Sequence, residues 1–359
     1  MLSVRPIGGA LLVGVAAAIF AAACGSTTPT PGSPVGSGQL AGAGATFPEP
    51  FYKKAFYTYS QKYPQVTVNY QAVGSGAGIQ QFIKGTVDFG ASDVPMGAAD
   101  ITAAGGADTL TQIPATLGVI SIAYNLPGVD KLQLDGATLA NIYLNHIKKW
   151  NDPAIMALNA GVKLPNSAIQ VVHRSDGSGT TYHFTDYLAK VSDEWKTAVG
   201  IGKSVSWKTG IGGPGNSGVA AAVTSNAGAI GYVELAYVVS THMTQAYLKN
   251  KNGKFVQASV AGATSAAAQN TSVSPTNFSI TDEPGDDTYP IAGFSWIIVH
   301  TSNSDTNKGK ALAYLFKWLV TDGQSIGTDL QYAPLPTSVQ ALAMTNLKLI
   351  KAGGQPVLT

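Results

Sequence analysis

The chain has 359 residues, which at roughly 150 residues per domain predicts about two domains. Hydrophobic residues make up 45% of it and charged residues 12%, so a large core can form and wholesale disorder is excluded. The net charge of +2 argues against a nucleic-acid partner, since such proteins usually carry a strong basic excess. One cysteine and five scattered histidines exclude an internal disulfide and argue against a metal centre.

The N-terminus has the pattern of an export signal. A basic residue precedes an apolar run over 7–23, and small residues lead directly into Cys24. This predicts a signal peptide over 1–23. The site resembles the bacterial lipobox, with Ala21 where Leu is usual, so Cys24 is expected to be acylated and to anchor the protein on the outer face of the cell membrane. An uncleaved transmembrane anchor is the alternative, but a run of about 17 residues is marginal for spanning. The uncharged Ser, Thr, Pro and Gly stretch that follows predicts a flexible tether over 24–39.

The body of the chain alternates between strand and helix patterns. This alternation favours α/β layers with mostly parallel sheets. The expected helices cover 48–62, 79–83, 137–144, 180–190 and 308–320, and the expected strands cover 66–70, 87–91, 116–124, 169–173 and 291–300.

Three Gly-rich segments lie next to predicted helix starts, at 42–48, 74–78 and 174–180. Helix N-termini expose unpaired N–H groups and the positive end of the helix dipole, so they bind anions well. Any one such turn is more often only a turn, and the sequence cannot show whether the three converge. Nucleotide-binding motifs and the Gly-x-Ser-x-Gly elbow of hydrolases are missing.

Arginine usage draws attention to the third segment. The chain has 20 Lys but only two Arg, and one of these is in the predicted signal peptide. Arg174 is therefore the only arginine of the predicted mature protein. Its planar fork suits a tetrahedral oxyanion, and we expect it to contact a ligand. The alternative is a structural pair with Asp176, and both roles are compatible if Asp176 orients the guanidinium.

Seven motifs together resemble the phosphate-binding proteins of bacterial Pst-type phosphate ABC transporters. The resemblance extends over nearly all of the chain after residue 39, with the motifs in the family's order. They are GAGATFPEP (42–50), VNYQAVGSGAG (68–78), TVDFGASDVPM (86–96), KWNDPAI (149–155), HRSDGSGTTYHF (173–184), GAIGY (228–232) and YAPLP (332–336).

The resemblance implies a fold and a ligand set. It implies a type II periplasmic-binding-protein fold, in which two α/β lobes joined by a hinge hold phosphate in the cleft between them. The first lobe is expected to combine 40–118 with 288–359, and the second to cover 119–287. The implied phosphate ligands are Ala45, Thr46, Phe47, Ser75, Asp93, Arg174, Ser178, Gly179 and Thr180, with Asp176 behind Arg174. The implied partners are inorganic phosphate and the membrane permease subunits of a phosphate ABC transporter, and no cofactor is expected.

Asp93 is the informative residue of this set. A carboxylate beside an anion is unfavourable unless the ligand keeps a proton that it can donate. Phosphate has such a proton and sulfate does not, so Asp93 is expected to exclude sulfate, while arsenate is not distinguished. The alternative role for Asp93 is a turn cap.

Two other function classes remain open. A secreted phosphatase would need an activated nucleophile or a metal cluster, and the sequence shows neither, so we expect no enzyme. A surface adhesin or sensor on the same fold is the other alternative.

Overall fold

The structure is a computed structural model that describes residues 34–359, which form one compact unit. The predicted signal peptide, Cys24 and most of the predicted tether lie outside the described residues. The end of the expected tether differs from the prediction: β1 (Gly38–Gly44) begins before residue 39, and Val35 is buried. A Cβ at Gly36 would clash with the carbonyl oxygen of Asn307. A composition of small and polar residues does not reveal whether a segment packs against the folded body, so the end of the tether was predicted too late in the chain.

A nine-stranded sheet runs through the whole unit. Its order is β2-β1-β3-β12-β4-β8-β6-β7, and β9 pairs with β4. The strands are β1, β2 (Val66–Ala72), β3 (Phe89–Ser92), β4 (Leu110–Asn125), β6 (Gln170–Arg174), β7 (Ile211–Gly213), β8 (Ala229–Glu234), β9 (Thr244–Gln245) and β12 (Ala292–His300). Two small sheets are formed by β5 (Gln133–Leu134), β10 (Tyr247–Lys249) and β11 (Phe255–Val256), and by β13 (Ser302–Asn303), β14 (Lys351–Ala352) and β15 (Gln355–Pro356).

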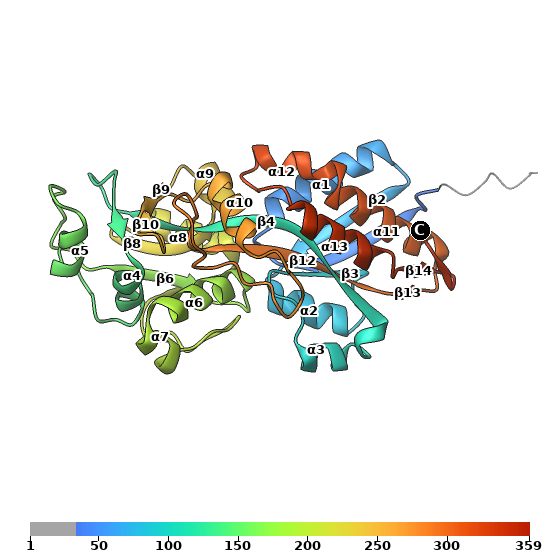
Figure 1. The fold of residues 1–359 in the computed structure, drawn as a ribbon, viewed down its shortest axis with the longest axis horizontal. Helices are drawn as coiled ribbons and strands as arrows, with labels where there is room; N and C mark the ends of the chain where they lie inside the picture. The colour runs from blue at the N-terminus through green and yellow to red at the C-terminus, as the bar shows by residue number, and fades with distance from the viewer. Residues whose placement is uncertain (1–33) are drawn as a thin grey trace, which may run out of the picture. The chain divides into compact units, whose positions relative to one another are not determined.

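Helices pack around this sheet at both ends of the molecule (Figure 1). They are α1 (Glu49–Lys62), α2 (Ser75–Ile83), α3 (Ala98–Ala103), α4 (Gly136–Tyr143), α5 (Pro153–Leu158), α6 (Gly179–Val191), α7 (Asp193–Ala198), α8 (Gly215–Ser225), α9 (Leu235–Ser240), α10 (Val260–Gln269), α11 (Thr306–Val320), α12 (Ser325–Asp329) and α13 (Thr337–Leu347). The blue and red elements gather at one end of the molecule and the green and yellow ones at the other, with β4 and β12 between them (Figure 1). No helix of residues 34–359 is long and apolar enough to cross a membrane.

The expectation of a mostly parallel sheet is only half right. β1 pairs in parallel with β2 and β3, and β6 pairs in parallel with β7 and β8. The two central strands run against their neighbours: β12 is antiparallel to β3 and β4, and β4 is antiparallel to β8. The α/β arrangement is therefore confirmed, but its two parallel sets are joined by antiparallel crossing strands.

The crossing strand β4 is longer than the expected strand over 116–124. It passes through Pro114, which has no N–H to donate to a sheet. The register between β4 and β12 shifts between Ser295 and Trp296, which pair with Thr116 and Pro114. A bulge of this kind is where a sheet tolerates proline, so the strand begins at Leu110 and not at residue 116 as predicted.

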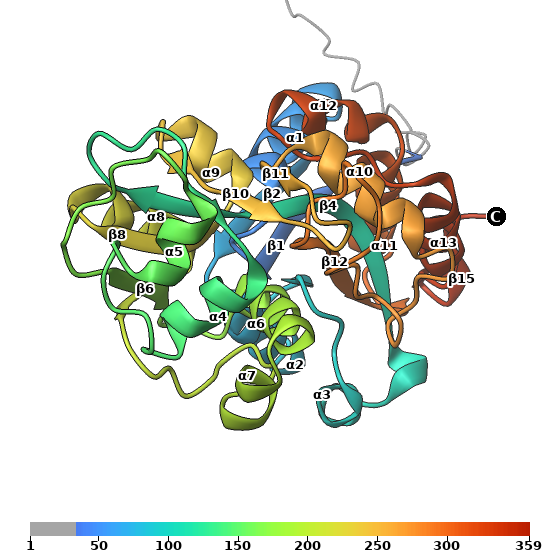
Figure 2. The same ribbon diagram turned by 60° about the vertical axis from the view of Figure 1, so that its left-hand side comes forward.

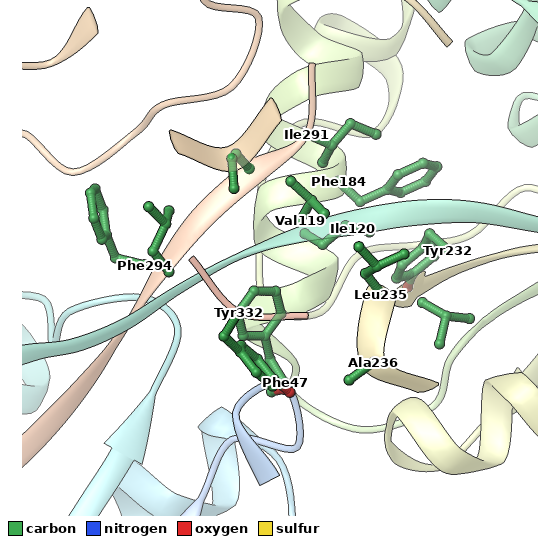
Figure 3. Close-up of a cluster of buried hydrophobic side chains, with 14 of the residues drawn as sticks. Phe47, Val119, Ile120, Phe184, Tyr232, Leu235, Ala236, Ile291, Phe294 and Tyr332 are labelled. Carbon is green, nitrogen blue, oxygen red and sulfur yellow. The ribbon is translucent and has the colours of Figure 1, made fainter. Parts of the chain in front are cut away.

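The hydrophobic core continues across the crossing strands. Val119 and Ile120 on β4 and Ile291 and Phe294 near β12 meet side chains from both ends of the molecule (Figure 3). The Tyr332 ring packs edge-on against Phe47, with the ring centroids 6.3 Å apart. This shared core holds the loop after β1 against the middle of the sheet, where the candidate site lies.

Candidate anion-binding site

The three Gly-rich segments converge. The Oγ of Ser75, the first residue of α2, accepts hydrogen bonds from the Gly179 amide at 3.1 Å and from the Asp93 amide at 3.2 Å. The Gly76 amide also donates to the Gly177 carbonyl oxygen at 2.8 Å, so the start of α2 lies against the segment before α6, and the two helices overlap in the view of Figure 2. Residues that are 18 and 104 positions from Ser75 therefore meet at its hydroxyl group. The first segment, which contains Thr46, joins the other two through a residue that the sequence analysis did not single out.

That residue is Asn216 on α8. Its Nδ2 donates to the Oγ1 of Thr46 at 3.0 Å and to the Oγ1 of Thr180 at 3.2 Å, and its main-chain N also donates to Thr46, at 3.1 Å. The Asn216 Oδ1 accepts from the Glu234 amide at 2.9 Å, which fixes the orientation of the side-chain amide. A fourth Gly-rich turn before a helix, GGPGNSG (212–218), was the signal that could have identified it.

Three site hydroxyls are arranged as donors. A hydroxyl oxygen accepts two hydrogen bonds and donates one. Thr46 accepts two from Asn216, Thr180 accepts one from Asn216 and one from Arg174, and Ser75 accepts two from main-chain amides. Because N–H groups occupy the lone pairs, each hydroxyl proton remains to be donated. Among residues 34–359, only Ser75 has a protein acceptor for its hydroxyl proton nearby, the Oδ2 of Asp93 at the long distance of 3.4 Å.

Arg174 is buried at the end of β6. Its Nε and one terminal nitrogen donate to the two carboxylate oxygens of Asp176 at 2.7 and 2.5 Å, and the other terminal nitrogen donates to Thr180 at 3.3 Å. The second N–H of each terminal nitrogen remains a donor. Burial alone would raise the pKa of Asp176, but the hydrogen bonds and charge of Arg174 and the Gly215 amide lower it below its ordinary value. Both expected roles of Arg174 are thus compatible with its geometry.

Asp93 lies directly after β3 and is 1% exposed. Its Oδ1 accepts from Ser295 at 2.8 Å, a contact that sequence reasoning missed because Ser295 lies within an apolar strand. Burial raises the pKa of Asp93 to about 7, against the opposing effects of the Ser295 hydrogen bond and the Arg174 charge. Near neutral pH the Asp93 carboxyl group can therefore gain or lose a proton at a small cost in free energy.

The predicted backbone ligands differ in whether their hydrogen-bond donors are already used within the protein. The Ala45 amide donates to the carbonyl oxygen of Ala91 at 2.9 Å, so that N–H is already used. The Ser178 amide donates to the carbonyl oxygen of Lys203 at 2.8 Å, and its Oγ caps α6 by accepting from Thr181 at 3.1 Å, which leaves the Ser178 hydroxyl proton. Phe47 has its ring in the core and its carbonyl oxygen bonded by Tyr332 at 2.7 Å.

Gly179 is required for this close approach. It begins α6 against Asp93, and a Cβ built on it would clash with the Asp93 side chain. Gly74 serves similarly at the start of α2: its φ is 92°, and a Cβ there would clash with the Asp176 carboxylate. The two helix N-termini can therefore meet only with glycine at these positions.

A second buried carboxyl group, Glu234, lies behind the loop that carries Thr46 and Phe47. Its Oε2 accepts from the Ala236 amide at 2.9 Å and lies 3.0 Å from the Tyr332 hydroxyl, and its Oε1 has no partner among the described residues. Burial raises the pKa of Glu234 well above its ordinary value. Burial thus favours the uncharged form of this carboxyl group behind the site.

The arrangement suits an oxyanion better than a metal ion. One arginine, three donor hydroxyls and two helix N-termini face each other, with a single carboxyl group that can exchange a proton. In the described part of the chain, no group of three or more His, Cys, Asp or Glu residues could hold a metal ion. The donor set is also neutral apart from Arg174, so it stabilises charge mainly by hydrogen bonds in a place of low dielectric constant.

Comparisons with known proteins agree with this picture. The PBP superfamily domain model matches residues 29–322, so the two-lobed α/β fold is that of a PBP-superfamily protein. The chain is 47% identical over 304 residues to the phosphate-binding protein PstS of Pasteurella multocida, covering 84% of this chain and 87% of that protein. It is 42% identical over 322 residues to the PstS of Xylella fastidiosa, covering 88% and 86%. The chain thus belongs to the PstS phosphate-binding protein family.

A solved structure shares the fold. A human phosphate binding apolipoprotein matches with a TM-score of 0.70, covering 88% of this chain and all of that one. The two sequences are only 19% identical, so this likeness concerns the architecture alone.

Proposed function

We propose that this protein binds inorganic phosphate outside the cytoplasm and delivers it to the permease of an ABC transporter. The observation that carries the proposal is the set of three hydroxyls, on Thr46, Ser75 and Thr180, whose lone pairs are filled by N–H groups. Toward a ligand, each of these hydroxyl groups can therefore act as a donor but not as an acceptor. With Arg174 they suit a small tetrahedral anion, and the relatives at 42–47% identity are named phosphate-binding proteins.

The proposed ligand set follows the predicted one with three changes. The hydroxyls of Thr46, Ser75, Ser178 and Thr180, the amide of Phe47 and the guanidinium of Arg174 donate to phosphate. Ala45 leaves the set because its amide is bonded to Ala91, and the Gly179 amide acts through the Ser75 hydroxyl to which it donates. Asn216 is added as the residue that orients two of the hydroxyls. Asp176 holds Arg174 in place.

Asp93 distinguishes anions that carry a proton from anions that do not. Hydrogen phosphate donates to its carboxylate, whereas sulfate carries no proton and places two negative groups against each other. Arsenate has a similar size and protonation, so this device does not separate it from phosphate. Binding, not turnover, is the proposed activity: no nucleophile paired with a base and no metal cluster accompanies the anion site among residues 34–359.

The hinge of the proposed two lobes lies where the crossing strands change partners. β4 pairs with β12 up to Val119 and with β8 from Ile120 onward. This change supports lobes of 40–118 plus 288–359 and of 119–287. Thr46, Ser75 and Asp93 then belong to the first lobe and Arg174, Thr180 and Asn216 to the second. Phosphate would hold the two lobes closed, and the closed form would dock on the permease.

Export and anchoring complete the proposal. The apolar run before Cys24 supports cleavage there, and acylation of Cys24 would attach the protein to the outer face of the cell membrane. A phosphate importer needs its receptor on that side. An adhesin or sensor role would use the same anchor and fold, but no feature of the site calls for it.

Calorimetry with inorganic phosphate tests the proposal, together with an assay of turnover of a chromogenic phosphate ester. The expected result is tight binding of phosphate with one site per chain and no turnover. Absence of phosphate binding, or hydrolysis of the ester at a rate that depends on Arg174, would overturn it.

A further inference from the structure

His183 is a fully buried histidine next to the proposed phosphate site, and neither the motifs nor the comparisons give it a role. It lies on α6, one turn after Gly179, and its Nε2 is 2.9 Å from the carbonyl oxygen of Asp93. A carbonyl oxygen can only accept, so Nε2 carries the ring proton and donates it. The other ring nitrogen, Nδ1, is buried with no hydrogen-bond partner among the described residues.

This arrangement costs free energy that an apolar side chain would not cost. Burying an unpartnered polar atom is unfavourable, and a leucine or phenylalanine in this position would fill the core without it. The hydrogen bond to the Asp93 carbonyl oxygen offsets part of this cost. The neighbouring strand also leaves room for it, because a Cβ on Gly293 of β12 would lie 2.5 Å from the His183 Nε2.

Asp93 is held on three sides. Ser75 accepts from its amide at 3.2 Å, His183 donates to its carbonyl oxygen at 2.9 Å, and Ser295 donates to its Oδ1 at 2.8 Å. Its Oδ2 is the oxygen that remains to meet a ligand. The bonds to the main chain fix the direction of the Asp93 Cα–Cβ bond, and the Ser295 bond fixes the rotation of the carboxyl group.

We propose that His183 is a positioning residue for anion discrimination: its Nε2–H holds the Asp93 main chain so that Oδ2 faces the protonated oxygen of the bound anion. The inference rests on the proposed phosphate function and adds to it. His183 is on α6, which also carries Gly179 and Thr180, so one helix both contributes donors to the anion and sets the acceptor opposite them.

The surroundings keep the imidazole neutral, which the proposal requires. Burial lowers the pKa of His183, and the charge of Asp186 on the same helix opposes this only in part. Asp186 is itself bonded by Ser279 and Thr281, and Lys190 lies 3.4 Å from it. From the other elements, the main chains of Asp93 and Phe294 contact the ring. A neutral imidazole has a single N–H, and the Asp93 carbonyl oxygen places it on Nε2.

The test compares two substitutions of His183. His183→Gln places an amide N–H near the position of Nε2 and keeps the donor, whereas His183→Leu fills similar space without one. The measurements are the dissociation constant for phosphate and the competition of sulfate against labelled phosphate. We expect His183→Leu to weaken phosphate binding about tenfold and to narrow the phosphate-over-sulfate ratio by a similar factor, and His183→Gln to restore most of both.

A matched control is His300, which also contacts a carbonyl oxygen, that of Thr109 at 3.3 Å, but lies outside the site. His300→Leu should leave affinity and selectivity unchanged. Equal selectivity in wild type and His183→Leu, or equal loss in the Leu and Gln variants, would overturn the proposal. If His183→Leu does not fold, His183→Met replaces it, and ¹⁵N NMR of the wild-type imidazole must find the proton on Nε2; a proton on Nδ1 contradicts the inference.

The wild type separates this inference from the proposed function. If the wild type binds no phosphate, the function itself is wrong. If it binds phosphate and excludes sulfate while the His183 variants behave alike, only the role of His183 is wrong.

Discussion

The side-chain amide of Asn216 donates to the hydroxyl of Thr46 at 3.0 Å although the two residues are 170 positions apart. The same nitrogen donates to Thr180. One amide thus sets the direction of two hydroxyl groups, on the loop after β1 and at the start of α6. Because the Glu234 amide binds the Asn216 Oδ1, the amide cannot turn over to accept instead.

Asn216→Asp is therefore a sharp test of how the site binds anions. The substitution keeps the shape but replaces the donating nitrogen by an accepting oxygen, so Thr46 and Thr180 would turn their protons away from the ligand. We expect a loss of phosphate affinity of about 3 kcal/mol, larger than the loss in Asn216→Ala. Calorimetry measures it. Asn226→Asp is the control, since Asn226 caps the other end of α8 through Ala222. Equal losses in Asn216→Asp and Asn216→Ala would contradict the donor argument.

Phosphate binding should depend on the planar shape of the Arg174 guanidinium as well as on its charge. Arg174→Lys keeps the charge but cannot bind both oxygens of Asp176 and the anion with one planar group. We expect phosphate binding to weaken by about 1–3 kcal/mol, and more in Arg174→Ala. Removing an exposed charge in Lys208→Ala should change little. Unchanged phosphate affinity in a folded Arg174→Ala protein would remove Arg174 from the site.

Sequence reasoning identified the parts of the site that belong to local patterns. Thr46, Ser75 and Thr180 lie in Gly-rich turns before helices, and such turns are visible in one sequence. Arg174 was visible because arginine is otherwise so rare in this chain. Their convergence was not visible, since it depends on long-range pairing: the bond between Ser75 and Gly179 spans 104 residues.

What the sequence did not reveal has physical reasons. Ser295 looks like a tolerated small residue in an apolar strand, and only the pairing of β12 with its neighbours brings it to Asp93. The strand predicted to begin at residue 116 begins at Leu110, and the bulge through which it accommodates Pro114 depends on a partner strand. The mixed direction of the sheet follows from two strands that cross between lobes, and periodicity within a strand contains no information about its neighbours.

The predicted lipid anchor is on Cys24, which lies outside the described residues, and a substitution there tests it. Cys24→Ser removes the thiol that acylation needs, so the protein should be released from membranes or remain an uncleaved precursor. Membrane fractionation and the apparent mass of the product measure this. Phosphate binding by the released protein should be unchanged, because the site lies in the folded body. A Cys24→Ser protein of mature size that still fractionates with membranes would contradict the anchor.

The proton on Asp93 gives a pH dependence with a definite sign. Burial raises its pKa from an ordinary value of 3.8 to about 7, so the folded protein binds this proton more tightly than the unfolded chain. The contribution of this carboxyl to stability is therefore present below about pH 4 and is lost as the pH rises through about 7. Denaturation without phosphate should show Asp93→Asn gaining stability over wild type between those values.

The same proton should govern selectivity. Above about pH 7 Asp93 is a carboxylate that accepts from hydrogen phosphate and repels sulfate, whereas below that pH it is an acid that can donate to sulfate. Sulfate should thus compete better against labelled phosphate at about pH 6 than at about pH 8, at fixed ionic strength. In Asp93→Asn, whose amide donates at any pH, sulfate should compete better than in wild type at about pH 8, and equally at both values. Asp282→Asn, away from the site, should follow wild type. If wild type and Asp93→Asn exclude sulfate equally at about pH 8, the site rejects sulfate by means other than the Asp93 carboxylate.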